Sequence, residues 1–188
     1  MNITKKLLLT FTLLIFSLII TNVISIFALS KVGNDAEYFQ VNTLPSLDAM
    51  NKESLKVLSV RSRLYLHGLT EDQAGMDAIK QEAIKLYDEV YAMHQNYIKD
   101  LASDPRDLEL SKKTLADLQA FRPVMDQYFK ISESNDRGAI IATMRQGGLV
   151  AGKISDLIND FAEQVAYNGS IVDKANKESS SLIQRSML

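Results

Sequence analysis

Hydrophobic and polar residues repeat along most of this chain with a helical period, after one long stretch that contains no charged residue. That stretch covers residues 7–30, and Lys5 and Lys6 precede it. A helix of this length is about 36 Å long, enough to cross a hydrocarbon layer of about 30 Å. Because basic residues before an apolar span hold that end in the cytoplasm, we expect residues 1–6 inside the cell and the remaining chain outside.

The alternative interpretation of this stretch is a cleaved secretory signal. Ala28-Leu29-Ser30 offers small residues at a cleavage-like spacing. The apolar core of such a signal, however, has only about 7–15 residues, so an uncleaved transmembrane helix is favoured. We therefore predict a transmembrane helix over residues 7–30, a single outer domain over residues 31–178 and a juxtamembrane end over residues 179–188.

The first outer helix is expected to extend to about Leu66, with a kink or short break near Asn42-Thr43-Leu44-Pro45. Proline lacks the backbone donor that a helix needs and moves the preceding residue away from helical geometry. Gly68 suits the end of this helix. Thr70 and Gln73 have the spacing of a capping box for the next one.

The second helix has the clearest pattern of the chain. Its apolar face alternates at four and three residues: Ala83, Tyr87, Val90, His94, Tyr97 and Leu101. This is the spacing that lines one side of a helix in a bundle. The helix should end near Ala102, and Asp104 and Pro105 should begin the third as N-cap and first helical residue.

The third helix carries an apolar stripe and contains Pro123, where we expect a bend rather than an end. Ser134-Asn135-Asp136 then restarts the chain. The fourth helix is predicted from Arg137 onward as one continuous element, with Gly147-Gly148 inside it. Four helices with short connections favour antiparallel neighbours. The predicted fold is all-α: an N-terminal transmembrane helix that continues into an antiparallel up-down-up-down four-helix bundle.

Charge and composition exclude several classes of function. The chain has 21 basic and 23 acidic residues, and taking away Lys5 and Lys6 leaves a net charge of −4 for the rest. This mild acidity, without a basic cluster, argues against a nucleic-acid partner. Because the chain has no cysteine, it holds neither a disulfide framework nor a thiolate metal site.

Beyond this pattern, the chain resembles the sensory half of bacterial chemoreceptors, the methyl-accepting chemotaxis proteins. The resemblance covers nearly the whole chain and depends on the order and spacing of degenerate motifs. Its closest marks are Asn42-Thr43-Leu44-Pro45-Ser46-Leu47, Ser59-Val60-Arg61-Ser62-Arg63-Leu64, Asp100-Leu101-Ala102-Ser103-Asp104-Pro105 and Asn135-Asp136-Arg137-Gly138-Ala139.

The resemblance implies a periplasmic ligand sensor that works as a homodimer, in which ligand binding moves the last helix slightly along its axis. The chain ends where a second membrane helix and the kinase-controlling cytoplasmic part would be expected. We interpret it as the front portion of a receptor or as the product of a truncated gene. A natural stand-alone bundle is the third interpretation.

Four residues are the candidates for ligand binding: Arg61, Arg63, Arg145 and Tyr128. Guanidinium groups capture small anions, such as a carboxylate, through paired hydrogen bonds. Arg61 is expected to face another helix, and Arg63 lies about 200° further around the same helix. Arg145 is expected near the distal part of the first outer helix. The alternatives to ligand binding are that the arginines are solvated or ion-paired and that Tyr128 packs in the core.

Enzymatic function is not indicated. Gly147-Gly148 is not followed by the Lys-Ser or Lys-Thr of a phosphate loop. Neither histidine has a metal-binding partner at the following helical turn. We interpret His94, on the apolar face of the second helix, as a satisfied core residue. An imidazolium at His67 would suit the negative end of a helix. We expect no catalytic residue, no cofactor and no metal.

The sequence thus predicts a ligand-sensing domain held at the bacterial inner membrane, with its bundle periplasmic or extracellular. Its expected partners are the membrane, a small solute such as an organic acid or amino acid, and a second copy of the chain. Two alternatives stay open. One is a membrane-anchored scaffold or chaperone of the cell envelope. The other is the input domain of a sensor kinase.

Overall fold

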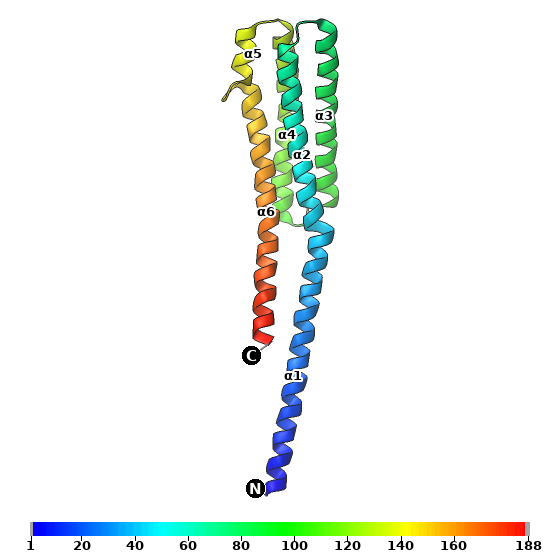
Figure 1. Cartoon of the computed structure of the whole chain (residues 1–188), viewed down its shortest axis with the longest axis vertical. Coiled ribbons are helices and arrows are strands. Elements are labelled where there is room, and N and C mark those ends of the chain that lie inside the picture. Colours follow the sequence, from blue (N-terminus) through cyan, green and yellow to red (C-terminus); the bar gives the residue numbers. More distant parts are fainter. Residues whose placement is uncertain (1, 187–188) are drawn as a thin grey trace. The chain divides into compact units, whose positions relative to one another are not determined.

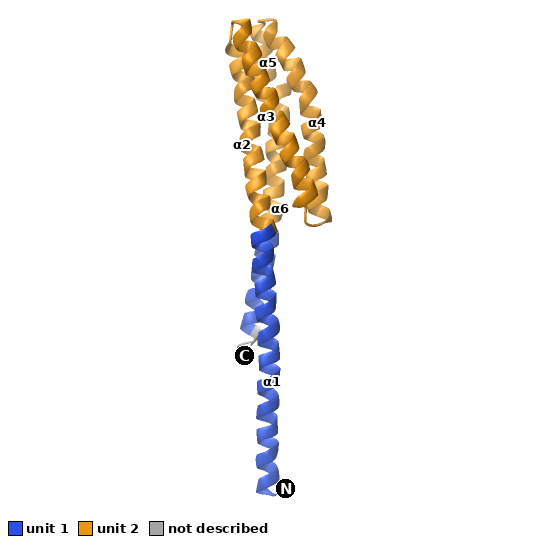
Figure 2. Ribbon diagram, turned by 90° about the vertical axis from the view of Figure 1, so that its right-hand side faces the viewer, with its two compact units in different colours: residues 1–41, 170–188 blue, residues 42–169 orange. Residues whose placement is uncertain are grey.

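The computed structural model describes residues 2–186, and every secondary-structure element among them is a helix. The chain divides into two compact units, coloured separately in Figure 2. The first comprises residues 1–41 and 170–188, and the second comprises residues 42–169. The all-helical fold class predicted from the sequence is confirmed. Residues 1, 187 and 188, which belong to the predicted segments 1–6 and 179–188, lie outside the described residues.

The first unit contains α1 (Ile3–Tyr38) and the C-terminal part of α6 (Leu149–Ser186). The large apolar side chains of α1 are exposed from Ile3 to Leu29. Where the two segments meet, Lys31 lies 3.2 Å from the carboxylate of Glu178 and 3.3 Å from that of Asp35. Of the described residues, one continuous helical stretch is apolar and long enough to cross a membrane, and it is this N-terminal one. A signal sequence near the N-terminus can meet the same criterion of length and composition.

The second unit is the bundle. A π-helical segment, η1 (Phe39–Thr43), spans the boundary between the units and leads directly into α2 (Leu44–Leu69). Pro45 falls in the first turn of α2, where its missing N–H is tolerated. The helix is not interrupted near Asn42-Thr43-Leu44-Pro45; in place of the predicted kink or short break, the backbone widens into the π-helical turn just before Pro45.

Three long helices complete the bundle with a short one between them: α3 (Gln73–Asp100), α4 (Pro105–Glu133), α5 (Arg137–Met144) and the first part of α6. Figure 1 shows α2, α3, α4 and α6 side by side, with successive long helices running in opposite directions. We call the end with the α2–α3 and α4–α5 turns the apical end, and the end with the α3–α4 turn the basal end. Helix α4 passes through Pro123 without ending, as expected.

Aspartate side chains cap the N-termini of three of these helices. Asp104 accepts hydrogen bonds from the backbone N–H groups of Arg106 and Asp107, with Pro105 at the first helical position, as predicted. Asp136 caps α5 in the same way. The predicted capping box at Thr70 and Gln73 is wrong. Asp72 caps α3 by accepting from the Gly75 N–H at 2.7 Å, because a carboxylate satisfies free amides at a helix N-terminus better than a hydroxyl.

The prediction of one unbroken helix through Gly147-Gly148 is also wrong, because the chain turns between α5 and α6. Gly147 has a φ of +77°, a left-handed conformation that side chains disfavour. A Cβ atom on Gly148 would collide with the backbone carbonyls of Ala142 and Thr143 at the end of α5. The two glycines therefore allow a turn between α5 and α6, and α6 begins at Leu149.

Candidate functional site

The apical end of the bundle contains a hollow of about 240 Å³. It lies between the end of α2, the end of α4 and the short helix α5. Its lining is almost entirely apolar and comprises Tyr65, Gly68, Leu69, Tyr128, Ile140, Ile141, Met144 and Arg145. We call this the apical hollow. A larger and more polar depression beside it, lined in part by Glu71 and Arg137, shares Gly68, Leu69 and the two isoleucines.

Tyr128 forms one wall of the apical hollow and is otherwise buried in the core. Its hydroxyl donates a 2.7 Å hydrogen bond to the backbone carbonyl of Leu64, which ties α4 to α2. Burial raises the pKa of Tyr128 to about 12, so the hydroxyl stays protonated at neutral pH. Gly68 makes this arrangement fit, because a Cβ atom there would collide with the Tyr128 hydroxyl and approach Ile140 within 2.9 Å.

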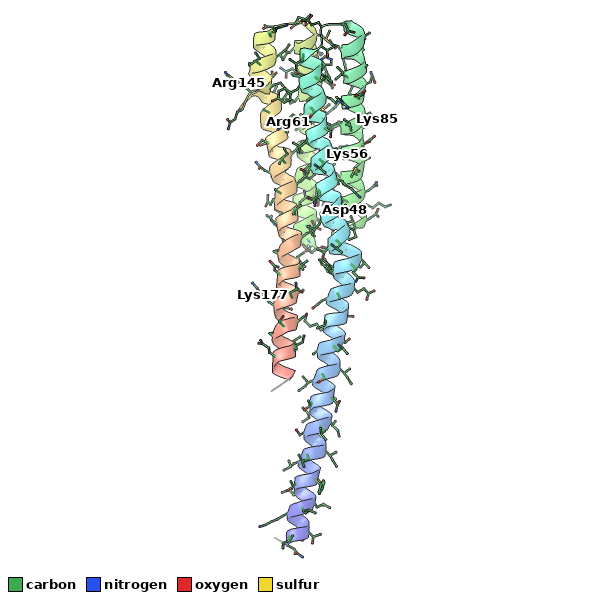
Figure 3. All side chains as sticks on the ribbon, in the orientation of Figure 1. Asp48, Lys56, Arg61, Lys85, Arg145 and Lys177 are labelled. Atoms are coloured by element: carbon green, nitrogen blue, oxygen red, sulfur yellow. The ribbon has the colours of Figure 1, made fainter. Side chains whose placement is uncertain are left out.

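Arg145 lies at the rim of the hollow, directly after α5. The Tyr65 hydroxyl donates a 3.0 Å hydrogen bond to the carbonyl of Met144 and so holds this turn against α2. The side chain of Arg145 is exposed and points away from the bundle (Figure 3). Among the described residues its guanidinium forms no ion pair, and in this conformation it faces solvent at the rim rather than the interior of the hollow.

The other two candidate arginines lie on different sides of α2. Arg61 is exposed and precedes Tyr65 by four residues, so it lies one turn from the hollow on the same face. Arg63 instead faces α3, and its Nε lies 2.9 Å from the Glu82 carboxylate. The structure thus places Tyr128 and Arg145 at one hollow, Arg61 next to it, and Arg63 in a surface ion pair.

His67 lies in the core at the same end, and its environment corrects the expectation of an imidazolium at a helix end. Its Nδ1 is 2.8 Å from the Ser132 hydroxyl, and its ring packs against Phe129 at a centroid distance of 4.9 Å. Burial lowers the pKa of His67, which favours the neutral ring. The buried Nε2 atom has no hydrogen-bond partner among the described residues.

A second set of polar residues crosses the core in the basal part of the bundle, and sequence reasoning identified only His94 in it as polar. We call this set the polar layer: Glu53, His94, Tyr97, Asp107, Ser111, Thr114, Gln164 and Asn168. His94 is satisfied on both ring nitrogens, as predicted, by Glu53 and by the carbonyl of Ser111. The signal for Glu53 was its place between Met50 and Val57 on the buried face of α2.

Of these two regions, the apical hollow is the one that is open to a solute. The apical hollow offers apolar contact and one unpaired cation at its rim, which suits a small organic anion. In residues 2–186, no three histidine, aspartate or glutamate side chains converge in the way a metal site requires. The lining and the rim cation of the apical hollow therefore fit the binding of a small solute.

Comparison with known families agrees with this geometry. Residues 1–182 match a family described as a four helix bundle sensory module for signal transduction. The chain belongs to this family. The sensory module spans α1 and the whole bundle, including the apical hollow, and the chemoreceptor resemblance drawn from the sequence is confirmed. No individual curated protein and no solved structure matches the chain significantly.

Proposed function

We propose that this sensory module is the extracytoplasmic input part of a transmembrane chemoreceptor and that it binds a small organic anion at the apical hollow. The observation that carries the proposal is the unpaired Arg145 at the rim of an apolar hollow, in a chain of a sensory family. Tyr128 and Ile141 would contact the body of the solute, and Arg145, joined by Arg61, would hold its negative group.

The lining of the hollow narrows the chemical class of solute. Leu69, Ile140, Ile141 and Met144 offer no hydrogen-bonding side chain, so a solute with several polar groups would lose its hydration without compensation. A monocarboxylate with an apolar body matches the site better than a dicarboxylate or a polar amino acid. We propose no catalytic residue, because the family is sensory and binding accounts for the site.

For the membrane part, we propose that α1 anchors the module in the inner membrane of a bacterium. The exposed apolar side chains of residues 7–30 would face lipid, with Lys5 and Lys6 on the cytoplasmic side and the bundle in the periplasm. Helix α6 is continuous from Leu149, next to the hollow's rim, to Ser186. A solute that shifts the start of α6 would therefore displace the whole helix along its axis.

We also propose that the module works as a homodimer. Leu44, Leu55 and Leu66 follow each other at an eleven-residue spacing, about three helical turns, so they share one face of α2. They are 46%, 64% and 43% exposed, respectively. A second copy of this face would cover them, and the sedimentation of the full chain in detergent measures whether it does. A purely monomeric chain would contradict this part of the proposal.

The solute proposal is tested with the full chain in detergent, by thermal unfolding in the presence of benzoate, hexanoate, succinate or aspartate. Benzoate or hexanoate should stabilise the bundle by about 2.7 kcal/mol at a hundredfold excess over Kd. Arg145→Gln should weaken that binding by roughly tenfold to a hundredfold, since hydrogen bonds to charged groups contribute about 1.5–3 kcal/mol. Arg106 is exposed at the basal start of α4, away from the hollow, and pairs with Glu109 and Glu163, so Arg106→Gln controls for the general effect of removing an exposed guanidinium.

Two outcomes would count against the proposal. Stabilisation by none of the four probes would favour the membrane-anchored scaffold. Equal loss of binding in Arg106→Gln and Arg145→Gln would place the anion elsewhere. Whether the module serves a chemotaxis receptor or a sensor kinase is decided by the cytoplasmic partner that co-purifies with the gene product in its native membrane.

A further inference from the structure

Glu53 of α2 and His94 of α3 form a pair in the core that is fully closed to solvent. Both side chains are 0% exposed. Glu53 Oε2 lies 2.7 Å from His94 Nδ1, and His94 Nε2 lies 2.8 Å from the backbone carbonyl oxygen of Ser111 on α4. One imidazole ring therefore links three helices through two short contacts.

These two contacts fix how many protons the pair holds. The Ser111 carbonyl only accepts, so the proton in that contact must be on Nε2. A neutral imidazole carries one N–H, which leaves Nδ1 as an acceptor facing Glu53. The contact between Glu53 and Nδ1 then needs a further proton. Either Glu53 is a carboxylic acid that donates to Nδ1, or His94 is an imidazolium whose second N–H donates to Glu53. Both arrangements contain one proton more than a glutamate ion beside a neutral histidine.

Among the described residues, no other neighbouring side chain provides the proton in the contact between Glu53 and His94. Burial raises the pKa of the Glu53 carboxyl, and the hydrogen bond to His94 opposes that rise. From α3, Tyr97 stacks on the imidazole at 6.0 Å, and burial and Asp107 raise its pKa well out of the neutral range. Asp107 of α4 is occupied by the Tyr97 hydroxyl, and α6 contributes the ring of Phe161 and the amide of Gln164.

We propose that the bundle core is a proton-binding site, in which Glu53 and His94 together retain one proton that the unfolded chain releases at neutral pH. The ligand of this site is the proton itself. Because the pair joins α2, α3 and α4, the pH of the medium sets how firmly these helices hold together. The site is separate from the apical hollow and does not depend on the proposed solute.

The direction of the pH effect follows from counting protons. An unfolded chain holds the extra proton on histidine only below about pH 6.5, and it gains a second on glutamate below about pH 4.3. Above pH 6.5 the folded pair thus binds more protons than the unfolded one, and stability falls as the pH rises. Between about pH 4.3 and 6.5 the two states hold the same number, and the contribution of the pair is constant.

The experiment measures denaturant unfolding of the full chain in detergent between pH 5 and pH 9, for the natural sequence and for Glu53→Gln. A glutamine amide donates to Nδ1 without a titratable proton, so the variant keeps both hydrogen bonds. Above pH 7 the unfolding equilibrium constant of the natural chain should rise by up to about tenfold per pH unit more than that of the variant. Glu109→Gln, an exposed change on α4, is the matched control and should keep the natural slope.

Equal slopes for the natural chain and Glu53→Gln would overturn the proposal. A second measurement on the unmodified protein decides the case if the variant does not fold. Nitrogen-15 NMR of the imidazole at pH 8 should show Nε2 protonated and Nδ1 sharing a proton with a carboxyl group. A His94 ring that loses this proton near pH 6.5 while the bundle stays folded would equally exclude the site.

Discussion

The two ends of the bundle are built on different principles. Around the apical hollow, Tyr128, Phe129 and Met144 form an apolar core in which nearly every polar group is a backbone atom, a tyrosine hydroxyl or His67. In the basal part, eight buried polar side chains of the polar layer are linked by hydrogen bonds across four helices. The same helices therefore pass from one kind of core to the other.

The two kinds of core place different demands on the geometry of the contacts between helices. Apolar contacts are non-directional, so the apical end places few demands on the orientation of the groups that meet there. Buried hydrogen bonds demand specific partners, so the polar layer fixes how the helices are aligned. In the function proposed above, the apical end would receive the solute and the polar layer would keep the helices aligned.

Breaking the Glu53–His94 pair should produce the largest effect in the molecule. His94→Leu leaves a buried carboxyl without its partner and should cost about 3–5 kcal/mol of the free energy of unfolding. Replacing both residues, Glu53→Leu with His94→Leu, removes the uncompensated group and should recover most of that loss. Denaturant unfolding of the single and double variants measures both values.

A double variant less stable than His94→Leu alone would contradict this account of the basal core. That outcome would mean that the apolar volume of the basal core, rather than an unpaired polar group, sets the cost. A double variant that is stable but no longer cooperative in unfolding would show that the pair mainly specifies alignment.

Much of the fold follows from the sequence because the helical period records burial directly. Ala83, Tyr87, Val90 and Tyr97, expected on one face of the second helix, are all buried. The break at Gly147-Gly148 escapes the same reasoning, since Met144 and Ala151 continue the three-and-four spacing across it. Spacing alone does not distinguish a glycine within a helix from one with a positive φ.

The candidate site is less accessible to sequence reasoning. Tyr128 and Arg145 are both candidates from the sequence, but that they line one hollow depends on how α4 and α5 pack against α2. Glu53 and His94 both lie on the buried faces of their helices, yet their pairing depends on the relative alignment of α2 and α3. One helix's periodicity contains no information on its alignment with another.

Two tyrosines allow the same substitution to be made at both ends. The Tyr97 hydroxyl donates to the Asp107 carboxylate at 2.9 Å and accepts from Asn168, so Tyr97→Phe should cost about 1.5–3 kcal/mol. The Tyr128 hydroxyl donates only to the Leu64 carbonyl, and Tyr128→Phe should cost about 0.5–1.5 kcal/mol. Unfolding in urea measures the difference. Equal costs would show that the polar layer contributes no more per hydrogen bond than the apical end.

Two glycine substitutions, of which Gly152→Ala has the smallest expected effect, test the backbone near the start of α6. Gly147 has a φ of +77°, so Gly147→Ala should lose about 1–2 kcal/mol from the strain of a left-handed alanine. Gly152 lies in α6, where a Cβ atom would meet open space among the described residues, and Gly152→Ala should gain up to about 1 kcal/mol by helix propensity. Thermal unfolding of both variants should therefore give changes of opposite sign. If Gly147→Ala were as stable as Gly152→Ala, the α5–α6 turn would tolerate a continuous helix, and the rim of the apical hollow would not be fixed by its backbone.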